Sequence, residues 1–225
     1  MSVVLPSCYQ IKLLCHFDND TTDSSIYGRT ATAVGNISYT SSATYRKWGY
    51  AMRMLRSGSN DGRLEYDISD VDLSKQFCID YWFNSIHASY WGQYVWKLST
   101  DKLQHKCGAV AEAGFYTEDQ FCQVTQTRRV SHHVAVTRDS NNMLRWFYDG
   151  VKQCEYQNSS DFTSPQIWLS WTYSNGTNAL TWMDEVRIVS GYPCYTDNFT
   201  PPATAYTIPD PEPANPFLYD TVRVL

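Results

Sequence analysis

The chain has 225 residues, of which 15% are aromatic and only 18% are charged, and its formal net charge is −5. This length suits one large all-β domain or two small ones, and it is enough to bury a core without cross-links. An acidic chain without a cluster of Lys or Arg lacks the phosphate contacts that dominate nucleic-acid affinity, so we expect no nucleic-acid partner. No run of about 18 apolar residues is present, so no membrane span is predicted.

The N-terminal sequence MSVVLPSCYQIKLLCHF has neither a basic start nor a continuous apolar core. It therefore does not predict a signal peptide. Either the chain works or is assembled inside a cell, or its export uses a route that this sequence does not encode. Seven cysteines are an odd number, so at least one lies outside any intrachain disulfide. Cys107 and Cys122 could bracket a hairpin, but spacing alone does not decide the pairing.

Short alternating segments follow one another along the whole chain. Strands are predicted at 11–17, 30–34, 37–44, 49–55, 63–66, 77–83, 94–98, 121–127, 133–137, 144–148, 151–156, 167–173 and 180–188. The segment 77–83 (FCIDYWF) is the clearest central strand, with its odd-numbered residues on one face and its even-numbered residues on the other. Asp149-Gly150 predicts a two-residue hairpin turn, because this pair accommodates positive φ. Turns about every 8–12 residues indicate a β-sandwich or barrel.

Acidic residues gather at two places that a sandwich can bring together. Asp18, Asp20 and Asp23 follow the first strand, and Asp184 with Glu185 interrupts the last one. First and last strands of a sandwich are often neighbours, which would place these acids at one rim. Oxygen ligands without His or Cys favour calcium. The alternative is that the loop aspartates bind backbone amides of their own turns, with Glu185 facing solvent.

The composition changes after the last strand. Pro201 and Pro202 cannot extend a central strand, and six of the nine prolines lie from Pro201 onward. We therefore divide the chain into a leader (1–9), a folded domain (10–203) and an extended Pro-rich tail (204–225). The tail should lie largely outside the core. Its apolar end, FLYDTVRVL, would dock on its own domain or on a neighbouring subunit.

Two motifs raise the question of hydrolysis. Glu65 and Asp67 would share a strand face, as in a glucanase, where retaining cleavage needs two carboxyls about 5–5.5 Å apart. The third acid, Asp70, is out of phase, which favours an edge strand with solvent-facing acids. His132 and His133 adjoin no nucleophile motif. Because adjacent strand residues point opposite ways, we expect one of them to be inward and neutral and the other exposed.

Two loops carry residues that suit recognition of a ligand by aromatic rings and amides. Tyr90 and Trp91 lie at the tip of the loop HASYWGQ, and Asn175 and Asn178 lie in the loop SNGTN. Exposed Tyr and Trp rings suit stacking on a sugar, with amides supplying hydrogen bonds. We predict these four as ligand-binding residues. The same loop would serve equally as a protein–protein hot spot, and most of the eight Trp residues should be packing residues.

Several motifs in order give a specific resemblance: LLCHFDNDTTDSS, FCIDYWF, HHVAVTRDSNNMLRWFYDGV and WMDEVRIVSGYPCYTDNFTPPA. Together, over about residues 11–203, they resemble laminin-G-like, concanavalin A-like lectin/glucanase domains, closest to the branch found in bacteriophage structural and tail proteins. The resemblance implies an all-β, two-sheet antiparallel jelly roll. It also implies a structural calcium ion at the rim, carried over onto Asp18, Asp23 and Asp184.

The function implied by this resemblance is non-catalytic. Such domains commonly bind glycans or proteins, and most are not enzymes. We expect a virion module, either a capsid decoration protein or a tail-fibre component, assembled in the host cytoplasm and present as a homo-oligomer or in many copies. Its partners would be other virion proteins, reached through the 204–225 tail, and host-surface glycans. The alternatives are a carbohydrate-binding lectin outside a virion and, ranked last, a glycoside hydrolase.

Overall fold

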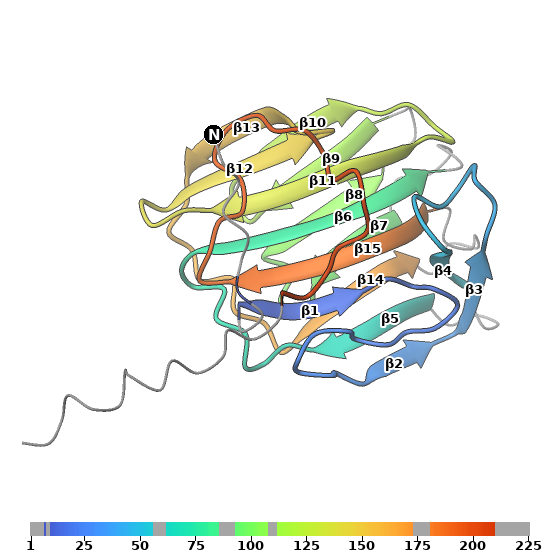
Figure 1. Cartoon of the computed structure of the whole chain (residues 1–225). Coiled ribbons are helices and arrows are strands. Elements are labelled where there is room, and N and C mark those ends of the chain that lie inside the picture. Colours follow the sequence, from blue (N-terminus) through green and yellow to red (C-terminus); the bar gives the residue numbers. More distant parts are fainter. Residues whose placement is uncertain are drawn as a thin grey trace, which may run out of the picture.

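The computed structural model describes residue 7 and residues 10–55, 62–85, 93–107, 112–172 and 181–209 (Figure 1). These residues form fifteen strands and no helix, in two antiparallel sheets. No helix in the described part of the chain could therefore cross a membrane. The two layers confirm the predicted β-sandwich.

Sheet A faces the viewer in Figure 1. Its strand order is β13 (Val151–Gln157), β12 (Met143–Tyr148), β11 (Ser131–Arg138), β6 (Phe77–Ser85), β15 (Thr181–Ser190), β4 (Ala51–Leu55) and β3 (Asn36–Thr40), and β1 (Ile11–Cys15) also pairs with β15. Sheet B lies behind it. Its order is β10 (Phe121–Thr125), β9 (Glu112–Thr117), β8 (Leu103–Cys107), β7 (Gln93–Leu98), β14 (Gln166–Thr172), β5 (Gly62–Asp67) and β2 (Ala31–Val34). The first and last strands, β1 and β15, are neighbours, as predicted.

The main core lies between the sheets. On β6 the odd-numbered residues Phe77, Ile79, Tyr81 and Phe83 all enter it, as the alternation predicted. Trp96 and Trp146 are its largest fully buried side chains, and the Trp146 ring stacks on Phe115 with ring centres 4.1 Å apart. Burial of this many large side chains is the dominant favourable contribution to folding.

The sequence predicts the Asp149-Gly150 turn correctly, but it does not predict two of the strands. Asp149 and Gly150 have φ of 49° and 77°, so the predicted hairpin turn between β12 and β13 is confirmed. Strands β8 and β9 were not predicted. In β8 the outward positions are Gln104 and Lys106, and the buried position between them is His105. Without apolar alternation, this segment carries no strand signal.

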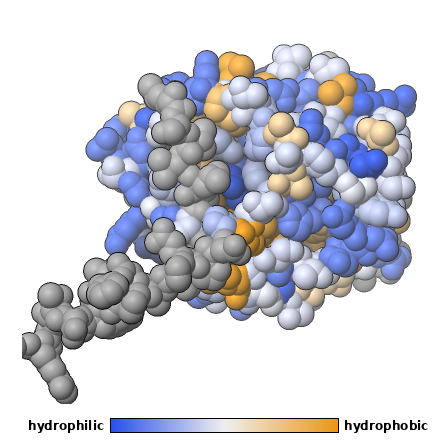
Figure 2. Space-filling model, in the orientation of Figure 1, coloured by the Kyte–Doolittle hydropathy of each residue, from blue (hydrophilic) through white to orange (hydrophobic). Residues whose placement is uncertain are grey.

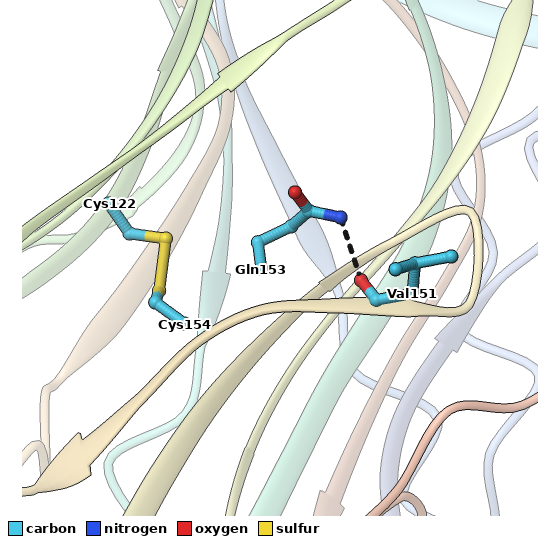
Figure 3. The surroundings of a disulfide bond; sticks show 4 residues. All are labelled: Cys122, Val151, Gln153 and Cys154. Carbon is cyan, nitrogen blue, oxygen red and sulfur yellow. Dashed lines mark hydrogen bonds between the residues drawn. A yellow bond between two sulfur atoms is a disulfide. The ribbon is translucent and has the colours of Figure 1, made fainter.

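Both open sides of the sandwich are closed. Cys122 on β10 and Cys154 on β13 form a disulfide between the edge strands of the two sheets, with Cα atoms 6.3 Å apart (Figure 3). Cys107 is a buried free thiol, so it is not the partner of Cys122. On the other side the chain passes from β2 to β3 at Gly35, which has φ of 91°. A side chain there would meet the Leu55 carbonyl oxygen at 2.4 Å.

A C-terminal strap, residues 191–208, covers the outer face of sheet A and passes in front of β6 and β15 (Figure 1). Tyr195 and Tyr206 are buried there against a second apolar cluster that includes Ile11, Phe147 and Val189. Packing therefore continues past residue 203, the predicted end of the domain, at least to Tyr206. The same face is largely hydrophilic on its surface, with small separate hydrophobic patches (Figure 2). Residues 210–225, most of the predicted tail, lie outside the described residues.

A buried charged network holds the strap to sheet A. Arg187 donates from Nε to Asp80 Oδ1 (2.9 Å) and from Nη2 to Oδ2 (2.7 Å). Two strap hydroxyls, from Tyr195 and Tyr206, donate to the same Oδ2 at 3.0 and 2.8 Å. Burial opposes ionisation of Asp80, but the Arg187 charge and the hydrogen bonds hold its pKa below the usual value.

His133 completes this network. Its Nε2 lies 2.9 Å from the Tyr206 hydroxyl, and burial lowers its pKa to about 4, so it is neutral at pH 7. His132 points the other way and bonds Asp149 at 2.7 Å. The prediction that one of the pair would be exposed is wrong, since both are buried. The strap, which sequence alternation cannot reveal, covers the face on which His133 lies.

Asp80→Asn should lower the free energy of unfolding by about 3–5 kcal/mol, because Arg187 would keep a buried charge without its partner. Urea unfolding measures the change. The double variant Asp80→Leu/Arg187→Met should lose less than the single variant, since it leaves no unpaired charge. A loss below about 1 kcal/mol in the single variant would mean that water reaches the pair and screens it.

Candidate functional site

The three aspartates predicted to bind calcium lie in two separate settings. Asp23 binds the backbone beside β1: Oδ1 accepts from the amides of Leu14 and Ser25, each at 2.9 Å. Its Oδ2 accepts from the Ser25 hydroxyl and the Arg29 amide, also at 2.9 Å. Four hydrogen bonds occupy this carboxylate, as the turn alternative predicted.

Asp18 and Asp184 hold one loop from two sides. Asp184 Oδ2 accepts from the amides of Lys47 (2.7 Å) and Trp48 (2.9 Å), and Asp18 Oδ1 accepts from the Tyr50 amide (2.9 Å). Asp184 is buried, and its Oδ1 has no hydrogen-bond partner among the described residues. Burial raises the pKa of Asp184 to about 7, and the nearby carboxylates of Glu185 and Asp18 add to the effect.

Glu185 joins the two ends of the domain. It lies at an irregularity of β15 with φ of 53°, which turns its side chain to the same outer face as Asp184. Its Oε1 lies 2.7 Å from His16 Nδ1, and its Oε2 accepts from the Tyr206 amide at 2.8 Å. It is buried rather than solvent-facing.

The fit to calcium is partial. The unpaired Asp184 Oδ1 and the nearby Asp18 would suit a cation, but Asp23 is committed to backbone amides. Among the described residues, no group of three or more His, Cys, Asp or Glu side chains is placed to hold a metal ion. Calcium at Asp18, Asp23 and Asp184 stays a prediction from the sequence.

The four predicted ligand residues, Tyr90, Trp91, Asn175 and Asn178, lie outside the described residues. Their two segments adjoin paired strand ends, since β7 begins at Gln93, which pairs with Thr172 at the end of β14. Tyr94 and Trp171 form the next pair along these strands. Tyr94 and Trp171 belong to a surface that the structure does describe.

That surface is a stripe of alternating rings and cations across the outer face of sheet B. Its members, from one edge to the other, are Arg63, Trp168, Lys97, Trp171, Tyr94, Lys106, Tyr116 and Phe121. They come from β5, β14, β7, β8, β9 and β10, which are consecutive strands in that sheet. The sequence alone does not predict this stripe, because its members come from six different strands.

The contacts along the stripe are continuous. Arg63 lies 4.5 Å from the centre of the Trp168 ring, and Lys97 Nζ lies 4.6 Å from the same ring and 4.4 Å from Trp171. Lys106 Nζ bridges Tyr94 at 4.8 Å and Tyr116 at 4.6 Å. These distances are within the range of cation–π attraction.

The rings also contact one another, and a bulge brings two of them together. Tyr94 lies 4.4 Å from Trp171, and Tyr116 lies 4.5 Å from Phe121, centre to centre. Trp168 and Trp171 are three residues apart, yet both point outward because β14 has an extra residue at Ser170, where φ is 52°. Phe121 is the most exposed ring, at 47%.

Two of the three cations in the stripe are paired with an acid. Lys97 is paired with Asp101, and Arg63 donates to Glu65 Oε1 at 2.6 Å. Burial lowers the pKa of Lys106. Rings with polar edges, interleaved with donors whose charge is largely balanced, are typical of surfaces that bind sugars by stacking and hydrogen bonding.

Glu65 and Asp67, the acids of the hydrolase alternative, share a face of β5 as predicted. Glu65 is held by Arg63 and by Gln166 Nε2 at 3.3 Å. Hydrogen bonds from Ser69 lower the pKa of Asp67, whereas a general acid needs a raised one. Asp70 lies beyond the strand and pairs with Arg29 at 2.8 Å. These acids do not form the protonated and ionised pair that glycoside hydrolysis requires.

No protein-family model matches the sequence, and neither does any curated protein sequence. Solved structures do match the fold. A binding domain of botulinum neurotoxin DC in complex with rat synaptotagmin II superposes with a TM-score of 0.63 at 14% identity, over 84% of this chain and 49% of that one. The receptor-binding domain of botulinum neurotoxin type G gives 0.63 at 10% identity, over 82% and 48%.

A third structure, the botulinum neurotoxin DC binding domain in complex with SialylT, gives a TM-score of 0.63 at 13% identity, over 81% of this chain and 48% of that chain. The chain thus spans about half the length of these neighbours. At such low identity the likeness establishes the fold, a β-sandwich also used by receptor-binding domains.

Asp184→Asn should change how stability depends on pH. The folded-state pKa of about 7 lies above the ordinary 3.8, so between these values the folded state binds more protons than the unfolded state. The contribution of Asp184 to stability should therefore fall, by roughly 1–3 kcal/mol in total, as pH rises from about 4 to 7. Asparagine does not titrate, so the stability of the variant relative to the wild type, measured by urea unfolding at each pH, should rise over this range.

The matched control is Asp67→Asn, which replaces an exposed acid whose pKa is lowered. Its free energy of unfolding should change between pH 4 and 7 as that of the wild type does. If Asp184→Asn did the same, Asp184 would be ionised in the folded protein across this range.

Proposed function

We propose that this chain is a non-catalytic glycan-binding module and that the stripe on sheet B is its ligand surface. The observation that carries the proposal is the continuous run of contacts among five rings and three cations across that sheet. The core lies on the other face of these strands. Trp171 and Lys97 are buried within the stripe, so the half-buried Trp168 and Tyr116 and the exposed Phe121 would offer the contact surface. A row of this length would accommodate several sugar units of one chain.

The fold supports this reading. One neighbouring structure belongs to botulinum neurotoxin type C, whose entry into cells depends on interaction with two ganglioside molecules. Another is a botulinum neurotoxin DC binding domain in complex with SialylT. By analogy, glycans are the ligand class for the present chain, with a protein receptor as the alternative, since a third neighbour is bound to synaptotagmin. We propose that the loop residues Tyr90, Trp91, Asn175 and Asn178, whose segments adjoin Gln93 and Thr172 in the sequence, belong to the same ligand surface.

The biological setting that we propose is a virion, as a capsid decoration or tail-fibre component. The support is the ordered set of phage-type motifs, together with residues 204–225 as the segment that would dock on other virion proteins and favour a multi-copy assembly. The disulfide between β10 and β13 suits a protein exposed to an oxidising medium. A lectin outside a virion would use the same surface and is the alternative.

A structural calcium ion on Asp18 and Asp184 is a further part of the proposal, supported by the buried Asp184 Oδ1 without a partner among the described residues. The unfolding measurements on Asp184→Asn, repeated with calcium and with chelator, test it. Calcium should stabilise the wild type above pH 7 and leave the variant unchanged.

Trp168→Ala and Tyr116→Ala should each weaken glycan binding about tenfold, because each removes one stacking ring. The wild type is first screened on an array of neutral and sialylated glycans, and the affinity of each variant is then measured by calorimetry on the strongest binder. Trp91→Ala should weaken the same glycan if the loop belongs to the surface.

Tyr50→Ala is the matched control. Tyr50 is an exposed aromatic residue that directly precedes β4 of sheet A and is not part of the stripe. Its contact with Asp18 uses only its backbone amide. The control should bind like the wild type. An array without binders, or equal losses in Tyr50→Ala and Trp168→Ala, would remove the glycan proposal.

The virion role has a separate test. The full chain should co-sediment with phage particles or form a defined oligomer in analytical ultracentrifugation, and a chain truncated after Pro209 should lose that association while keeping its glycan affinity. A monomer that joins no particle but binds glycans would favour the lectin alternative.

A further inference from the structure

Two cysteines outside the disulfide face each other across the strap. Cys78 lies on β6 and is fully buried, and Cys194 lies in the strap and is half-buried. Cys78 belongs to the apolar cluster beneath the strap, and Cys194 packs against that cluster. Burial, and then the nearby Cys194 thiol, raise the pKa of the Cys78 thiol. The two residues are thus neighbours in space although 116 positions separate them in the sequence.

The surroundings place both thiols firmly. Arg187, held by its pair with Asp80, also reaches Cys194 Sγ, at 3.9 Å from Nη2. The chain turns sharply at Cys194, where φ is 27°. The next residue, Tyr195, is fixed by its hydroxyl on Asp80 and by its carbonyl, which accepts from Thr137 at 2.8 Å. Cys194 therefore has little freedom to move away from Cys78.

The other described free cysteines differ. Cys15 is fully buried in the main core, and Cys107 lies 4.0 Å from Gln126 Oε1. Both are in the core between the sheets, on the opposite side of sheet A from the strap or within sheet B. Neither offers a solution-facing thiol, whereas Cys194 is accessible in part.

We propose that Cys78 and Cys194 form a second disulfide when the protein meets an oxidising solution, and that this bond locks the C-terminal strap onto sheet A. The reaction takes a small-molecule disulfide such as oxidised glutathione as oxidant. Cys194, the more accessible thiol, attacks as thiolate and forms a mixed disulfide, releasing one glutathione thiol. Cys78 then attacks the Cys194 sulfur and releases the second glutathione, so that two protein thiols are oxidised and one glutathione disulfide is reduced.

The lock would act on the part of the chain that leads to residues 210–225. In the reduced protein the strap is held by the hydroxyls of Tyr195 and Tyr206 and by the Tyr206 amide on Glu185. A covalent bond at Cys194 would keep the strap in place even when these contacts open transiently. The strap would then be releasable during assembly in a reducing cytoplasm and permanent outside the cell.

The experiment compares the full chain before and after incubation with oxidised glutathione. Free thiols are alkylated under denaturing conditions, and the protein is digested without reduction and mapped by mass spectrometry. We expect a new peptide pair joining Cys78 to Cys194, two fewer alkylated thiols, and a melting temperature higher by about 10 °C. Hydrogen exchange of the Tyr206 amide should slow in the oxidised protein.

Three variants make the result specific. Cys194→Ser and Cys78→Ala should each abolish the new peptide pair and the rise in melting temperature. Cys194→Ser changes a half-buried strap residue, so it should fold even if Cys78→Ala does not. Cys107→Ala, the matched control in the core, should keep both effects.

Alkylation of Cys78 and Cys194 as separate thiols after oxidation would overturn the proposal, as would glutathione retained on Cys194 without transfer to Cys78. A rise in melting temperature that persisted in Cys194→Ser would also overturn it, because the stabilisation would then come from another site.

Discussion

The buried pair of Asp80 and Arg187 is the interaction on which the rest of this structure depends. It lies on the outer face of sheet A, a face that in a two-sheet sandwich commonly meets water. Charges removed from water there need a partner and further hydrogen bonds in place of solvent. Tyr195 and Tyr206 supply those bonds from the strap, at 3.0 and 2.8 Å from the Asp80 carboxylate. The strap keeps water from the pair, and the pair holds the strap, so neither would be stable alone.

This arrangement makes the two faces of the sandwich different. Sheet A is covered by the strap and by the loop that Asp184 and Asp18 hold through its backbone amides. The outer face of sheet B carries the stripe of rings and cations instead. The two sheets thus differ in what lies on their outer faces. On the proposed function, the outer face of sheet B would bind the ligand, while sheet A fixes the segment that leads to the C-terminus.

Sulfur chemistry follows the same division. The Cys122–Cys154 bond joins the edges of the two sheets, where it restricts the unfolded chain and protects strand edges that would otherwise be open to pairing. The contact between Cys78 and Cys194 lies instead beneath the strap. The disulfide concerns the integrity of the sandwich, and the proposed second bond would concern the attachment of its C-terminal segment. A protein assembled in one redox environment and used in another would benefit from this difference.

The sequence by itself determined the class of fold, the central strand β6 and the turn at Asp149-Gly150, because alternation and turn propensity are local properties of the chain. It also placed the first and last strands side by side. It could not reveal β8, whose buried position is His105, nor the burial of both His132 and His133. Only the tertiary structure decided the pairing of Cys122 with Cys154, the strap over Asp80, and the stripe from Arg63 to Phe121. Each of these depends on contacts between strands far apart in the sequence, and no local pattern records which residues the sheets will bring together.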